Sequence, residues 1–305
     1  MNKEFKDVRE FANEIKGRLE DIYVGVNIQV TEAVKNNDNL LIGLTFRNMG
    51  ESLSPQVYLN DMYESFVNGK RNIDEITLLV QRVFNEQIDK PWISLDADSL
   101  RNWESIKDKV IVRLFGIDNN EEYLSDAVYM PVCDNLAEVV FVMFDRQESG
   151  VLTSKLTKSL FESLNITREE LFDVAIKNTM REFPAKIMGM SEMIRRITGS
   201  DEFGLSREEE ILYVLSNDIM VNGAATLLYN NVLRDFCVRF GTDRVIILPS
   251  SIHEAILVLP DTLLDKDELK RMVMEINDTV LSVEDVLSDD AYIYRLEDDQ
   301  IHVMK

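Results

Sequence analysis

Apolar residues recur along this chain at two spacings, and the spacing changes from one segment to the next. In the first twenty residues they fall three or four positions apart, at Phe5, Val8, Phe11, Ile15 and Leu19. That period places them on one face of a helix. Short apolar runs follow on both sides of a polar stretch, Lys35–Asn39 (KNNDN). Because Asn and Asp side chains favour tight reversals, we expect a hairpin over about Val24 to Arg47.

The next segment predicts a pair of helices and then a break. The first helix is short and closed by Gly69, and the second covers about residues 74–87. Residues 90–103 begin with Lys90-Pro91 and have no regular period, which is typical of a connector. We therefore expect two parts: residues 1–90 with the N-terminal helix, hairpin and helix pair, and residues 91–305 as a C-terminal α+β domain.

The C-terminal part is organised around residues 222–260, NGAATLLYNNVLRDFCVRFGTDRVIILPSSIHEAILVLP. Apolar residues keep helical spacing from Ala225 to Phe240, which predicts one long amphipathic helix ended by Gly241. Two very apolar strands follow, joined by a polar turn at residues 249–254. Elsewhere, hairpins and helices cluster without regular strand–helix–strand alternation. The expected fold is therefore α+β, with antiparallel or mixed sheets packed against helices in two sub-domains.

The charge balance narrows the range of partners. The chain is 45% hydrophobic, which is enough for a substantial core, and 33 Lys and Arg residues against 55 Asp and Glu residues give a net charge of −22. Phosphate neutralisation needs clustered Lys and Arg, and no such cluster occurs. Anionic membrane surfaces are disfavoured for the same reason. We expect no direct nucleic-acid binding and no membrane association.

Two further patterns indicate the cytoplasm. The N-terminal segment lacks the apolar region of a secretory signal, and the longest apolar runs are strand-sized. The two cysteines, Cys133 and Cys237, lie among apolar neighbours. Buried free thiols of that kind are typical of a reducing compartment.

The common cofactor and metal motifs do not occur. The sequence has no phosphate-binding glycine loop of either common type and no GxSxG nucleophile turn. His253-Glu254 begins like a helical zinc motif, but Leu257 occupies the position of the second histidine. A set of Cys133, Cys237, His253 and His302 lacks the short paired spacings of zinc sites. We expect neither a metal nor a cofactor.

The turn that contains His253 supplies the candidate catalytic residues: Ser250, Ser251, His253 and Glu254. A hydrolase could use a serine as nucleophile and the histidine as base. However, residues adjacent on one turn rarely align in those roles, because such sites are assembled from separate segments. In the alternative interpretation the serines satisfy turn backbone groups and His253 is a structural hydrogen-bonding residue.

Three residues before the expected long helix are candidates for ligand binding: Asn217, Asn222 and Gly223. Backbone amides at a helix N-terminus can hold an anion. Alternatively, Asn222 is the N-cap of the helix, since asparagine is favoured in that position.

Several spaced motifs carry a resemblance to a known family. They are Pro55-x-x-Tyr58-Leu59-x-x-Met62-Tyr63, Glu169-Glu170-Leu171-Phe172, Tyr213-Val214-Leu215-Ser216-Asn217, Asn222-Gly223-Ala224-Ala225, Leu248 to Glu254 (LPSSIHE), Asn277, and Leu287-Ser288-Asp289 before Tyr292. In these the chain resembles an uncharacterised family of anaerobic Gram-positive gut bacteria, classed as a domain of unknown function. The resemblance implies a bacterial, cytoplasmic protein and brings no activity, substrate or catalytic residue with it.

Three hypotheses about function remain open. The leading one is a non-catalytic protein that binds a protein partner or a small ligand. The second is a hydrolase centred on the His253 turn, which needs that histidine in a hollow beside a hydroxyl or carboxylate of another segment. The third is an acidic mimic of nucleic acid from a mobile element, which needs carboxylates in rows at phosphate-like spacing.

Overall fold

The computed structural model describes residues 4–47, 56–88, 97–147, 150–199, 210–260 and 266–304. The chain divides into two compact units. The first comprises residues 1–35 and 39–99, and the second comprises residues 36–38 and 100–305. Most of the predicted connector, residues 89–96, lies outside the described residues, and so does Pro55. Each unit is described by itself.

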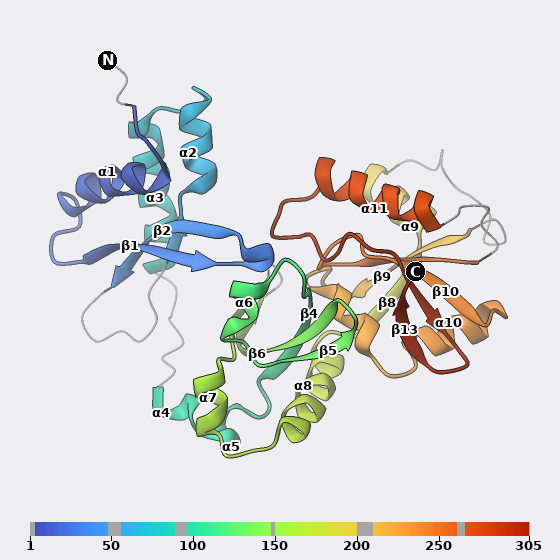
Figure 1. Ribbon diagram of the computed structural model, residues 1–305. Helices are drawn as coiled ribbons and strands as arrows, with labels where there is room; N and C mark the ends of the chain where they lie inside the picture. Colours follow the sequence, from blue (N-terminus) through green and yellow to red (C-terminus); the bar gives the residue numbers. More distant parts are fainter. Residues whose placement is uncertain are drawn as a thin grey trace. The chain divides into compact units, whose positions relative to one another are not determined.

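The first unit combines a small antiparallel sheet with helices (Figure 1). Its elements are α1 (Val8–Glu20), β1 (Asn27–Val34), β2 (Leu40–Arg47), β3 (Gln56–Tyr58), α2 (Asn60–Val67), α3 (Ile73–Ile88) and the start of α4 (Ala97–Leu100). The sheet order is β1-β2-β3. Asp7 caps α1, because its carboxylate accepts the Glu10 N–H at 2.8 Å. The predicted helix, hairpin and helix pair are thus all present.

The core of the first unit comes from its own elements. The inward faces of α1 and α3 pack on the sheet through Phe11, Ile15, Ile76, Val80 and Phe84, all at most 1% exposed. The Phe46 ring stacks on the Phe84 ring with centroids 3.9 Å apart. The first unit therefore has a hydrophobic core of its own.

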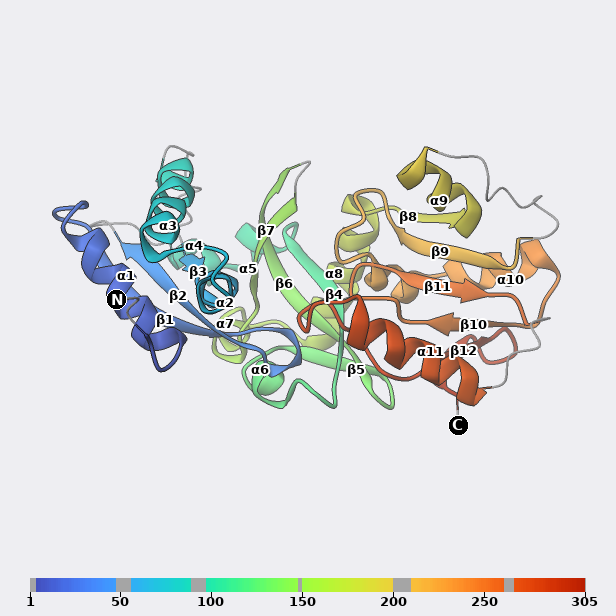
Figure 2. The ribbon, with the colours of Figure 1, turned by 90° about the horizontal axis from the view of Figure 1, so that it is seen from above.

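The second unit contains two antiparallel sheets (Figures 1 and 2). The four-stranded sheet is made of β4 (Val110–Gly116), β5 (Tyr129–Cys133), β6 (Leu136–Gln147) and β7 (Gly150–Lys155), with β6 pairing to each of the others. The six-stranded sheet has the order β13-β12-β10-β11-β9-β8. Its strands are β8 (Ala185–Gly189), β9 (Leu212–Asn217), β10 (Arg244–Leu248), β11 (Ala255–Val258), β12 (Tyr292–Arg295) and β13 (Gln300–Val303).

Helices cover these sheets because alternate strand residues face opposite sides. Along β10, Val245 and Ile247 pack with α10 (Val232–Phe240), whereas Ile246 and Leu248 pack with α11 (Lys266–Thr279). Figure 2 shows α11 running alongside β10. On the four-stranded sheet, α8 (Arg168–Glu182) buries its apolar face against β4 and β6. The shorter helices of the unit are α5 (Trp103–Ile106), α6 (Glu121–Ser125), α7 (Lys158–Ser163) and α9 (Met190–Thr198).

The α+β class, with antiparallel sheets packed against helices, is confirmed. The strands on both sides of the His253 turn are β10 and β11, paired with Leu248 opposite Ile256. The Thr167 hydroxyl accepts the Glu170 N–H at 3.1 Å, so Thr167 caps the start of α8. Among the described residues, no helix is both long and apolar enough to cross a membrane.

The prediction of a single long helix before Gly241 is wrong. A short 3-10 helix, η2 (Gly223–Leu228), comes first, and α10 begins only at Val232. Between them Tyr229 is extended and Asn231 is left-handed, with φ 68°. Asparagine enters the left-handed region more readily than most residues, so Asn230-Asn231 interrupts a helix that the apolar spacing alone would continue. Both η2 and α10 pack apolar residues against the sheet, so apolar residues keep a helical spacing through the break.

Candidate functional site

The turn between β10 and β11 is held by its own serine. The Ser251 N–H donates to the Glu254 carbonyl at 3.1 Å, and the Ser251 hydroxyl accepts the His253 N–H at 3.0 Å. Ser251 is only 5% exposed. Its hydroxyl therefore satisfies the backbone of a tight turn, as short polar side chains commonly do.

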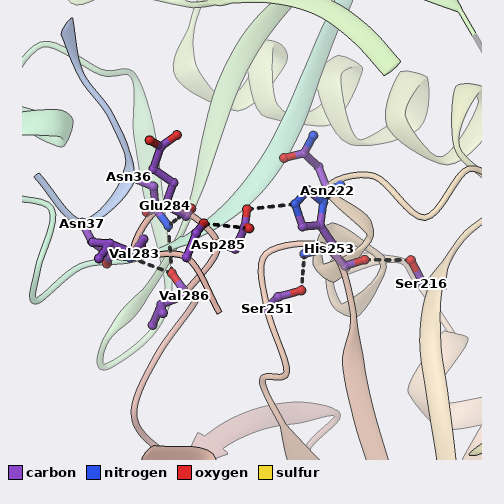
Figure 3. Close-up of polar contacts among 11 residues, drawn as sticks. Asn36, Asn37, Ser216, Asn222, Ser251, His253, Val283, Glu284, Asp285 and Val286 are labelled. Atoms are coloured by element: carbon purple, nitrogen blue, oxygen red, sulfur yellow. Dashed lines mark hydrogen bonds and ion pairs between the residues drawn. The ribbon is translucent and has the colours of Figure 1, made fainter. Parts of the chain in front are cut away.

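The imidazole of His253 contacts two other segments (Figure 3). Its Nδ1 accepts the Asn222 backbone N–H at 3.1 Å, and its Nε2 lies 3.1 Å from Asp285 Oδ1. A backbone N–H can only donate, so Nδ1 must be unprotonated. The ring proton is then on Nε2 and points to the Asp285 carboxylate. Both ring nitrogens are occupied within the protein.

Asp285 fixes the position of the loop that follows α11. Its second carboxylate oxygen accepts the Ser282 hydroxyl at 2.8 Å, and its carbonyl accepts the Ile252 N–H at 2.8 Å. The Asp285 N–H also donates to the Ser282 carbonyl at 3.0 Å, which closes a turn in this loop. The loop and the His253 turn are therefore joined through both backbone and side chain.

Gly223 lies where two segments leave no space for a side chain. A Cβ built on this glycine would lie 2.0 Å from the Ser216 hydroxyl oxygen and 2.4 Å from the His253 carbonyl oxygen. These two oxygens are themselves linked, because the Ser216 hydroxyl donates to the His253 carbonyl at 2.7 Å. The six residues Ser216, Asn222, Gly223, Ser251, His253 and Asp285 are called the His253 network below. They come from β9, the start of η2, the β10–β11 turn and the loop after α11.

The remaining catalytic candidates make contacts that do not include the imidazole. Ser250 donates its hydroxyl to Glu254 Oε1 at 3.4 Å, a long hydrogen bond across the turn. The Ser251 hydroxyl bonds to the backbone of His253. Among the described contacts, neither serine hydroxyl bonds to a ring nitrogen. The structure brings the four residues onto one turn without linking a serine to the histidine as nucleophile and base.

The three ligand-binding candidates differ in what they can offer. The Asn217 side chain is 2% exposed and is engaged by the backbone of residues 219 and 221. Gly223 is buried in the His253 network. Asn222 is left-handed, with φ 53°, and makes no side-chain cap bond to η2. Its carboxamide points away from the His253 ring (Figure 3). Of the three candidates, Asn222 is the one whose side chain remains available to bind a ligand.

Asn222 lines a narrow cavity of about 10 Å³ together with Arg113 and Tyr229. Burial lowers the pKa of the Arg113 guanidinium to about 10, and the group lies over the Phe141 ring at 4.5 Å. A space of this size holds one water molecule at most. The cavity therefore marks a polar gap in the core, too small for an organic ligand.

Two asparagines, Asn36 and Asn37, hold the same loop (Figure 3), and a third, Asn120, bonds to them. They lie in η1 (Asn36–Asp38) and at the start of α6, all within the second unit. Asn36 donates to the Glu284 and Val286 carbonyls at 2.8 Å each, and Asn37 donates to the Val283 carbonyl at 2.6 Å. Asn120, which is fully buried, donates to Asn36 Oδ1 at 3.0 Å.

A second polar cluster contains the other resemblance motifs of this region. Asn277 donates to the Ser288 carbonyl at 3.0 Å and to Asp289 Oδ1 at 2.8 Å. The buried Tyr292 hydroxyl lies 2.6 Å from the Ser288 hydroxyl and 2.8 Å from Asn135 Oδ1, and burial raises the pKa of Tyr292. These residues fix the end of the loop and the start of β12.

The cysteines and the second histidine lie apart from the His253 network. Cys237 lies on the buried face of α10, and Cys133 is half-buried on β5; both are free thiols, and burial raises the pKa of each. His302 on β13 pairs with Asp298 at 2.8 Å. Among the described residues, no group of three or more His, Cys, Asp or Glu side chains could hold a metal ion.

The fold and the site together define an α+β protein whose distinctive turn is tied into a polar framework. A family model matches residues 3–296, and its description is a family of unknown function, DUF5688. The chain belongs to this family. No match was found among curated proteins or among solved structures.

Proposed function

We propose that this protein acts in the cytoplasm by binding, without catalysis, and that the His253 network is the framework that holds its binding surfaces in place. One observation carries the proposal: both nitrogens of the imidazole are engaged, by the Asn222 N–H and by Asp285. A general base needs one free ring nitrogen beside the proton that it abstracts. Here the Nδ1 lone pair is used by the backbone.

The hydrolase alternative keeps one supporting observation, the carboxylate of Asp285 beside His253 at 3.1 Å. In a serine hydrolase the carboxylate orients one ring nitrogen while the other faces the nucleophile. In this protein the second nitrogen faces a backbone amide instead. Ser250 and Ser251 would both have to leave their turn contacts to reach the ring.

A serine-reactive probe distinguishes the two functions. The purified full chain is treated with a fluorophosphonate, and modified peptides are identified by mass spectrometry. The proposal predicts no modification of Ser250 or Ser251, both in the unaltered protein and in His253→Ala. Modification of either serine that disappears in His253→Ala would establish the hydrolase and overturn the proposal.

A further inference from the structure

An acidic hollow of about 700 Å³ lies on the second unit, beside the Asn277 cluster. It is formed by η1, α6 with the residues before it, the end of α11 and the loop after α11. Five carboxylates line it: Asp38, Asp118, Glu121, Asp278 and Asp289. Among the described residues that line it, none is a lysine or arginine.

Two of the five carboxylates are already used by the fold. Asp38 accepts the N–H groups of Glu122 and Tyr123 at 3.0 and 2.7 Å, which caps the start of α6. Asp289 accepts from the Asn277 side chain. The other three, Asp118, Glu121 and Asp278, are exposed and have no ion-pair or hydrogen-bonding partner for their carboxylates among the described residues. Like charges gathered on one surface attract cations from solution.

Asn277 supplies an independent observation at the same place. It lines the hollow and is 7% exposed. Its nitrogen donates to Ser288 and Asp289, so the orientation of the amide is fixed, and its Oδ1 has no partner. Among the described residues this is the only buried side-chain oxygen or nitrogen left without a hydrogen bond. A buried acceptor of this kind calls for a donor, because a buried polar atom without a hydrogen bond destabilises the fold.

The hollow also has an apolar part, which indicates what kind of cation fits. Leu281, Val283 and Val286 contribute to its lining, and Val283 is 58% exposed. The volume lies within the range of about 300–1,000 Å³ that is usual for small-molecule sites. A bare metal ion would leave most of this space and the apolar surface unused.

We infer that the acidic hollow binds a linear aliphatic amine carrying two or more ammonium groups, with the carboxylates and Asn277 Oδ1 accepting its N–H groups. The hydrocarbon between the ammonium groups covers Val283 and its apolar neighbours. The inference deepens the proposed binding function by naming a class of ligand. It does not depend on the serine-probe result, so failure of one leaves the other testable.

Isothermal titration calorimetry of the full chain at low ionic strength tests this assignment, with spermidine, 1,4-diaminobutane and Mg²⁺ as probes. We expect 1,4-diaminobutane to bind more tightly than Mg²⁺, which has the same charge. In Glu121→Gln/Asp278→Asn we expect spermidine affinity to fall about tenfold, since two of the carboxylates that accept from the amine are lost. Val283→Ser should weaken the diamine and leave Mg²⁺ unchanged.

The matched control is Asp61→Asn/Glu64→Gln, which removes two exposed carboxylates from α2 in the first unit. It changes the net charge equally, and spermidine affinity should stay within about twofold of the unaltered protein. Equal losses of spermidine affinity in the two double variants would overturn the assignment, because the amine would then be attracted by the overall charge of the protein and not by the acidic hollow. Absence of amine binding, or Mg²⁺ binding as tightly as 1,4-diaminobutane, would overturn it as well.

Discussion

At the scale of single residues, Gly223 shows most directly how the His253 network limits the sequence. A methyl group there would overlap the Ser216 hydroxyl and the His253 carbonyl, at 2.0 and 2.4 Å. It would also lie 2.8 Å from the Asn217 backbone nitrogen. Two of these three atoms belong to the backbone, so the crowding cannot be relieved by rotating a side chain.

We therefore predict that Gly223→Ala lowers the free energy of unfolding by about 2–3 kcal/mol, the usual cost of overpacking. Gly17→Ala is the matched control, because Gly17 lies in the exposed part of α1 and nothing is within 4 Å of its added Cβ. That variant should gain about 0.5–1 kcal/mol from helix propensity. Urea unfolding measures both. Full recovery of Gly223→Ala by Ser216→Ala would contradict the account, which ascribes part of the clash to backbone atoms.

Glu138 on β6 gives a prediction about pH. It is 8% exposed, and burial raises the pKa of its carboxyl from 4.5 to about 7. The folded protein therefore holds this proton more tightly than the unfolded chain does. The contribution of this carboxyl to the free energy of unfolding is complete below pH 4.5. It is lost as the pH rises from 4.5 to about 7, and it does not change further above 7.

Removing this carboxyl with Glu138→Gln should flatten the pH dependence of stability over the same interval. The difference between the two proteins, measured by urea unfolding from pH 4.5 to 8, should change by up to about 3 kcal/mol. The slope decides the outcome, because the glutamine can alter stability by itself at all pH values. Parallel curves for the two proteins would show that Glu138 ionises normally in the fold.

At the scale of elements, the sequence predicted the strands and most helices, because apolar periodicity reports which face is buried. It located the β10–β11 turn for that reason. It could not place the break between η2 and α10, because both pieces keep the same spacing toward the sheet. It also missed Asp285 and Ser216 as partners of the His253 turn. Each lies more than thirty positions away along the chain, and pairing at that distance is set by tertiary packing.

The break itself can be tested at Asn231. In the left-handed conformation, with φ 68°, alanine costs about 1–2 kcal/mol, whereas glycine is tolerated. We expect Asn231→Ala to lower the free energy of unfolding by about 1 kcal/mol and Asn231→Gly to leave it nearly unchanged. A continuous helix predicts the reverse order, since alanine is the better helix former. Thermal unfolding of the two variants therefore distinguishes a break at Asn231 from a continuous helix.

At the scale of the whole molecule, the two units have separate cores, one around Phe84 and one around Phe236. We expect them to lose structure separately when one core is damaged. In the full chain, Phe84→Ala should reduce hydrogen-exchange protection in the first unit and spare peptides from β9 to β11. Phe236→Ala should do the opposite. A loss of about 3–5 kcal/mol at each site makes the effect measurable. Simultaneous loss of protection in both units, from either variant, would show one cooperative domain.

The central claim concerns the state of His253, and long-range ¹H–¹⁵N correlation spectra of the imidazoles measure it directly. His302 is the only other histidine, so His302→Gln assigns the signals. We predict that the ring proton lies on Nε2, facing Asp285, and that Nδ1 is unprotonated and accepts the Asn222 N–H. A proton on Nδ1 would contradict this prediction, because a protonated Nδ1 cannot accept the Asn222 N–H.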